Sequence, residues 1–128
     1  MIRRIQALIC ALLLFGVAPV AQAQDVSSLT ARAAAILEGA SADGNEVQTL
    51  LAALTQAREP EADCMAALLL RDIRRDTAQA LPLLLRAAQN GSPRAQWELG
   101  NMLLEGKGTA QNSRQAAEWY RRAAVQGF

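Results

Sequence analysis

The chain has 128 residues, which is the length of one domain. Hydrophobic residues make up 52% of it but aromatic residues only 4%, and alanine and leucine dominate, which suits closely packed helices better than a sheet. The net charge of +1, without long blocks of like charge, gives no support for nucleic-acid binding, and the lack of histidine excludes histidine-based catalysis and most zinc sites.

The N-terminal segment has the pattern of a secretory signal peptide. Residues 1–4 include two arginines, residues 8–17 are apolar, and Ala21 and Ala23 are small residues at the positions a signal peptidase reads. We therefore expect residues 1–23 to be removed by cleavage between Ala23 and Gln24. The alternative, a membrane anchor, is disfavoured because the apolar run is shorter than the ~20 residues a span needs. The expected product is bacterial, periplasmic or secreted, and without a membrane span.

Residues 24–60 are predicted to form a first helical hairpin, either as a cap or as a degenerate repeat. Ser27 or Ser28 can cap a helix that ends at Gly39. Asp43 precedes an acidic residue by the spacing of a capping box and predicts the start of a second helix. That helix has an apolar stripe at helical spacing, formed by Val47, Leu50, Leu51 and Leu54.

Residues 61–91 are predicted to form a second, degenerate unit, with Pro60 suited to the first turn of its first helix. Asp76 and Gln79 repeat the cap spacing before the second helix. Pro82 lies a few residues past this cap, where proline removes a backbone hydrogen bond, so we expect a kink or a later helix start. The expected apolar face of the first helix consists of Ala62, Ala66, Leu69, Leu70 and Ile73.

A mixed-charge cluster lies between the two helices of this unit. It contains Arg71, Asp72, Arg74, Arg75 and Asp76. The plainer interpretation is ion pairing within a solvated turn. The functional alternative is a contact with an anion or with an acidic partner.

Cys64 is the cysteine that remains after the expected cleavage, so the mature chain can form no internal disulfide. Its plainer role is that of a small buried helix residue. An intermolecular disulfide is the alternative.

Residues 92–128 form the third unit and repeat part of the second at an offset of about 36 residues, a period typical of an α-solenoid. Gly106 and Gly108 separate two segments with helical periodicity. Asn112 lies at the spacing of an N-cap residue before the second of these predicted helices. A glycine-rich phosphate loop is disfavoured because no strand precedes Gly106 and because Lys107 lies between the glycines.

The third unit resembles the Sel-one-like repeat, a relative of the tetratricopeptide repeat. The residues that carry the resemblance are Ala95, Leu99, Gly100, Gly106, Gly108, Asn112, Ala116, Trp119, Tyr120, Ala123, Ala124 and Gly127. In the second unit the loop is shorter and lacks the two glycines, and leucines replace the Trp-Tyr pair. We therefore expect an all-α fold, a short α/α superhelix of about three hairpins after the signal peptide.

The resemblance implies an adaptor or scaffold that binds a protein or peptide on the concave face. Within the third unit, we expect the partner-binding residues to be Gln96, Trp97, Asn101 and Met102. No catalytic, cofactor-binding or metal-binding residues are expected. An immunity protein that neutralises a toxic periplasmic effector is the main alternative. An enzyme acting on cell-wall or β-lactam compounds is disfavoured, because such secreted relatives carry paired cysteines and the expected mature region lacks a Ser-x-x-Lys pair.

The last helix also suggests a contact surface. Gly100 and the Ala123-Ala124 pair permit close helix approach, while the rings of Trp119 and Tyr120 fill wider gaps. No polar capping helix follows Phe128 in the sequence, so this face is expected to self-associate or to bind a partner.

Overall fold

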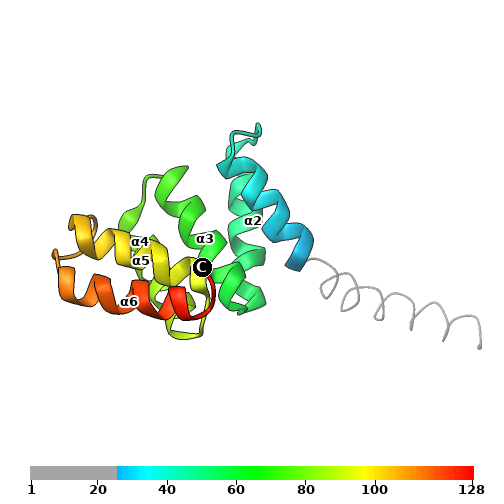
Figure 1. The fold of residues 1–128 in the computed structure, drawn as a ribbon. Coiled ribbons are helices and arrows are strands. Elements are labelled where there is room, and N and C mark those ends of the chain that lie inside the picture. Colours follow the sequence, from blue (N-terminus) through cyan, green and yellow to red (C-terminus); the bar gives the residue numbers. More distant parts are fainter. Residues whose placement is uncertain (1–25) are drawn as a thin grey trace, which may run out of the picture.

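The computed structural model describes residues 26–128, and over this range it contains helices and no strands (Figure 1). The expected all-α fold is confirmed. The predicted signal peptide, residues 1–23, lies outside the described residues. A helix over residues 26–37 precedes α2 (Gly44–Ala57), α3 (Pro60–Asp72), α4 (Thr77–Gln89), α5 (Pro93–Glu105) and α6 (Ser113–Val125).

The helices stack in chain order, as in an α-solenoid. Each of α3, α4, α5 and α6 packs against the helix before it, and α3 also contacts α5. The ribbon shows the hairpin of α5 and α6 lying against that of α3 and α4 (Figure 1). Each unit therefore buries its apolar face against its sequence neighbours, which is how repeat arrays are stabilised.

Side-chain caps define the helix starts. Asp43, Asp76, Ser92 and Asn112 precede α2, α4, α5 and α6, and the side chain of each accepts a hydrogen bond from a backbone N–H in the first turn. The predicted caps at Asp43, Asp76 and Asn112 are thus confirmed. The predicted cap of the first helix at Ser27 or Ser28 is wrong, because the helix already includes Val26 and both serines lie within it.

Helix α4 runs continuously through Pro82 from Thr77 to Gln89, so the predicted later start is wrong. A proline ring here leaves the carbonyl of Ala78 without its helical donor. Because both Ala78 and Pro82 lie on the exposed side of α4, water can satisfy that carbonyl. The Asp76 cap and the buried positions of α4 are sufficient to hold the first turn in place.

Helix α3 is buried on all sides over residues 62–70, not along one stripe. It is covered by α2, α4 and α5, so even Asp63 and Cys64, which lie outside the expected apolar face, are inaccessible to solvent. The expected burial of Ile73 is wrong. Ile73 is the C-cap residue of α3, and its side chain is exposed where the helix leaves the core.

Two glycines of the third unit lie at close contacts. A Cβ atom on Gly100 would come within 2.7 Å of the Tyr120 ring, so the absence of a side chain lets that ring lie against α5. Gly108 has a φ of 70°, and a Cβ atom there would collide with the methyl group of Thr77 at the start of α4. Gly108 therefore brings the loop of the third unit into contact with the second unit.

Candidate functional site

A groove of about 580 Å³ lies between the first helices of two consecutive hairpins, and we call it the α3–α5 groove. Its walls come from the C-terminal end of α3, from one side of α5, and from the loop after α5. The lining residues are Arg71, Asp72, Arg75, Thr77, Glu98, Asn101, Met102, Glu105, Lys107 and Gly108. The groove therefore presents charged and amide side chains at the junction of two units.

Ion pairs fix most of the charges in this groove. Arg71 Nη1 donates to Glu98 Oε2 at 2.8 Å, and Arg71 Nε donates to Asp72 at 2.6 Å. Lys107 Nζ lies 2.6 Å from Glu105 Oε2. The hydrogen bond to Asp72 and that to Glu98 raise the pKa of Arg71, so its guanidinium stays charged. The pair between Arg71 and Glu98 joins α3 to α5 across the groove.

Asn101 is held by the second helix of its own unit. The Tyr120 hydroxyl donates to Asn101 Oδ1 at 2.6 Å, and the Tyr120 ring lies against Gly100. Burial raises the pKa of Tyr120, so the hydroxyl remains a donor at neutral pH. The Asn101 side-chain amide N–H groups make no hydrogen bond with any residue of the described range 26–128, so they are available to a ligand in the groove.

The four predicted partner-binding residues do not form one surface. Asn101 and Met102 line the α3–α5 groove, although Met102 is largely buried. Gln96 is also buried, since it donates to the Ala88 carbonyl and accepts from Gln126. Trp97 lies elsewhere, with its ring 6.3 Å from that of Phe128. Gln96 and Trp97 therefore lie apart from the α3–α5 groove, because the helix turns Gln96 toward α4 and brings the Trp97 ring near that of Phe128. A binding role for the four residues stays a prediction.

Exposed apolar side chains gather near the end of α6. Trp97 is 43%, Val125 82% and Phe128 56% exposed, and we call these three residues the end face. Trp119 and Tyr120, also expected to be poorly covered, are half-buried, and the Arg122 guanidinium lies 4.7 Å from the centre of the Trp119 ring. The expected apolar surface is therefore smaller than the sequence suggests.

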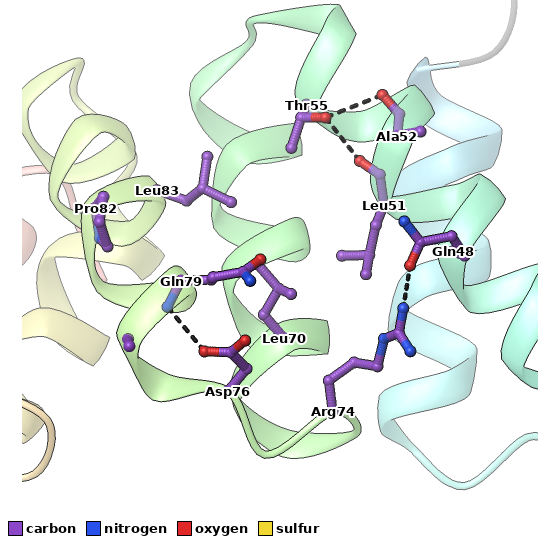
Figure 2. Close-up of a pocket in the computed structure, with 11 residues that line it drawn as sticks. Gln48, Leu51, Ala52, Thr55, Leu70, Arg74, Asp76, Gln79, Pro82 and Leu83 are labelled. Atoms are coloured by element: carbon purple, nitrogen blue, oxygen red, sulfur yellow. Dashed lines mark hydrogen bonds between the residues drawn. The ribbon is translucent and has the colours of Figure 1, made fainter.

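A second groove lies between α2 and α4 and has a volume of about 740 Å³ (Figure 2). Leu51, Leu70 and Leu83 come from three different helices and line it, while Arg74 donates a hydrogen bond to Gln48 at its edge. No sequence pattern identified this groove, because its sides belong to two hairpins whose separation is set by packing.

A buried ion pair that sequence reasoning missed holds the second unit together. Arg86 Nε donates to Asp63 Oδ2 at 2.7 Å and Arg86 Nη2 to Asp63 Oδ1 at 2.5 Å, which is a bidentate contact between α4 and α3. The Asp63 side chain is 2% exposed and that of Arg86 48% exposed. The sequence gives no sign that Asp63 is buried, because helical periodicity places this acidic residue outside the apolar face of its helix.

Cys64 is buried, and this burial raises the pKa of its thiol to about 12. A thiol in this state is neither a nucleophile nor accessible to another chain. The structure therefore supports the plainer interpretation, a packed helix residue, and argues against an intermolecular disulfide in the native state.

Residues 26–128 hold no group of three or more acidic, cysteine or histidine side chains arranged to bind a metal ion. In the same range, none of the helices combines the length and the apolar character needed to cross a membrane.

The comparisons with known proteins agree with this geometry. The pattern of the Sel1 repeat matches residues 64–92 and again residues 93–128, which together are about half of the chain. No curated protein and no solved structure matches the chain significantly. The two matched segments correspond to α3 with α4 and to α5 with α6, the hairpins that form the α3–α5 groove. The chain therefore belongs to the Sel1 repeat family, whose repeats generally mediate interactions between proteins.

Proposed function

We propose that this protein is an exported interaction module that holds a polypeptide segment of a partner protein in the α3–α5 groove. The observation that carries the proposal is the position of the groove between the first helices of the two matched repeats. Asn101 contributes amide donors there, and the neighbouring charged side chains offer both signs of charge.

The groove is also well suited to binding because its side chains are already held in place. Arg71 is fixed by Glu98 and Asp72, and Asn101 is fixed by Tyr120. Side chains that are ordered before binding lose less conformational entropy when a partner arrives, and this favours affinity. The mechanism is recognition alone, and we propose no reaction.

Export to the periplasm is part of this proposal, and it is supported by the composition of residues 1–23. The mass of the mature protein tests it. We expect the protein recovered from the envelope fraction to begin at Gln24. A protein that is found in the cytoplasm and still carries residues 1–23 would refute the export.

Photo-crosslinking in the native envelope tests the groove. The photoreactive residue p-benzoylphenylalanine replaces Glu105, an exposed residue at the groove edge, in one variant. In matched variants it replaces Ala52, in the α2–α4 groove, or Trp97, on the end face. Melting temperatures close to that of the wild type confirm that each variant is folded.

We expect a defined adduct from the variant at Glu105 and none from the variant at Ala52. Adducts from Ala52 but not from Glu105 would assign binding to the α2–α4 groove and refute the proposal. A single adduct that consists of a toxic effector would identify the protein as an immunity protein, which is the same binding mode with one dedicated partner.

Self-association through the end face is a second candidate function, and the exposure of Trp97, Val125 and Phe128 favours it. Analytical ultracentrifugation tests it. We expect a concentration-dependent dimer for the wild type that Trp97→Glu dissociates. A monomer over the whole concentration range would remove this candidate without affecting the α3–α5 groove.

A further inference from the structure

Arg75 adopts a backbone conformation that non-glycine residues rarely take. Its φ is 57°, in the left-handed region that disfavours residues with a Cβ atom. Counted from the first helix of each unit, Arg75 corresponds to Gly108, whose φ is 70°. The second unit therefore has an arginine where the third has a glycine, and the fold tolerates the strain that this arginine introduces.

The Arg75 side chain lines the α3–α5 groove and is exposed. The other two cations of the groove, Arg71 and Lys107, are paired with Glu98 and Glu105. Arg75 makes no hydrogen bond and no ion pair within residues 26–128. It is thus a guanidinium in a groove whose own carboxylates are already engaged by other cations.

We propose that Arg75 recognises an acidic side chain of the partner, so that the α3–α5 groove prefers an acidic polypeptide segment. This inference rests on the proposed function and adds the chemistry of the bound segment. A guanidinium forms paired hydrogen bonds with a carboxylate, and Arg75 needs no prior partner to be displaced before it does so. The Asn101 amide, which lines the same groove from α5, can donate to the backbone carbonyls of the same segment.

The proposal predicts opposite effects of one substitution on stability and on binding. Arg75→Gly removes the strain and also the guanidinium, so the melting temperature should rise by about 4–8 °C while binding weakens. Arg58→Gly is the matched control. Arg58 caps α2 with a φ of 53°, is exposed, and is not among the residues that line the groove.

Fluorescence anisotropy with defined peptides tests the recognition. The probe is a labelled dodecapeptide of alternating glutamate and serine, and its neutral control has glutamine in place of each glutamate. We expect the wild type to bind the acidic probe more tightly than the neutral one at low salt. Arg75→Gly should weaken acidic-probe binding by about threefold to fivefold and leave the neutral probe unaffected, whereas Arg58→Gly should bind both as the wild type does.

Equal affinity of the wild type for the two probes, or an unchanged acidic preference in Arg75→Gly, would overturn the proposal. A preference lost equally in Arg58→Gly would overturn it too, because it would reflect overall charge. Raising the ionic strength should reduce the preference. These outcomes are separate from those of crosslinking, since an adduct at Glu105 together with no acidic preference would retain the groove and reject the role of Arg75.

Discussion

The buried ion pair of the second unit leads to an asymmetric prediction about stability. Arg86→Ala leaves the Asp63 carboxylate without a partner in a site where its side chain is 2% exposed. Removing one member of such a pair is expected to lower the free energy of unfolding by about 3–5 kcal/mol. Asp63→Ala instead leaves Arg86, whose side chain is 48% exposed and can be hydrated, so we expect a loss of about 1–2 kcal/mol.

The assay is thermal and urea unfolding followed by circular dichroism. For a domain of about 100 residues, 1 kcal/mol corresponds to roughly 4–8 °C, so Arg86→Ala should lower the melting temperature by at least ~12 °C. The double variant Asp63→Ala, Arg86→Ala leaves no unpaired charge at this buried site and should be more stable than Arg86→Ala alone. Arg122→Ala is the internal control, because Arg122 occupies the equivalent position of α6 and pairs with the exposed Glu118.

The order of the variants decides whether this reasoning is correct. If Asp63→Ala is as destabilising as Arg86→Ala, or if the double variant is the least stable of the three, the isolated buried carboxylate is not the cause of the loss. A large effect of Arg122→Ala would show that the position in the repeat matters more than the burial of the partner.

Four further outcomes are expected. Gly100→Ala should lower the free energy of unfolding by ~1–3 kcal/mol, because the new methyl group would collide with the Tyr120 ring. This loss is expected although alanine has a higher helix propensity than glycine, so an increase in melting temperature would refute the close contact. Gly108→Ala should destabilise it by a similar ~1–3 kcal/mol, and adding Thr77→Ser, which removes the opposing methyl group, should restore part of the loss in urea unfolding. Cys64 should resist alkylation by iodoacetamide at pH 8 in the native protein and react in urea, and rapid native labelling would contradict its burial. Because its folded pKa is raised to about 12 from the ordinary 9.0, the stability that it contributes should be lost as the pH rises through that interval.

The helices were predictable because their signals are local. Aspartate and asparagine caps, a proline at the first turn of α3 and the apolar stripes all act within one or two turns, and the structure has the corresponding starts at Asp43, Pro60, Asp76 and Asn112. Proline was a weaker signal. The later start expected as one consequence of Pro82 is not found, because an exposed proline loses a hydrogen bond that water can replace.

The site was less predictable because it depends on contacts between units. Gln96, Trp97, Asn101 and Met102 lie close together in the sequence of α5. Whether each is buried or exposed depends on where α4 and α6 pack, and this packing buries Gln96 and brings Trp97 near Phe128. The Arg71–Glu98 pair and the Asp63–Arg86 pair likewise join residues far apart in the chain. The sequence suggested, as one alternative, that the arginine cluster contacts an acidic partner. It could not show that Arg71 is ion-paired with Glu98 while Arg75 forms no ion pair within the part of the chain that the structure describes.

The Arg71–Glu98 bridge joins the two halves of the groove, which belong to different repeats. A ligand that contacts both halves loses part of its contacts if the two repeats separate. Its binding therefore stabilises the packing of one repeat against the other. Occupancy should therefore suppress independent fraying of the last hairpin and make unfolding more nearly all-or-none. Slower amide hydrogen exchange in α6, a helix that the ligand does not contact, would then be the remote signature of a filled groove.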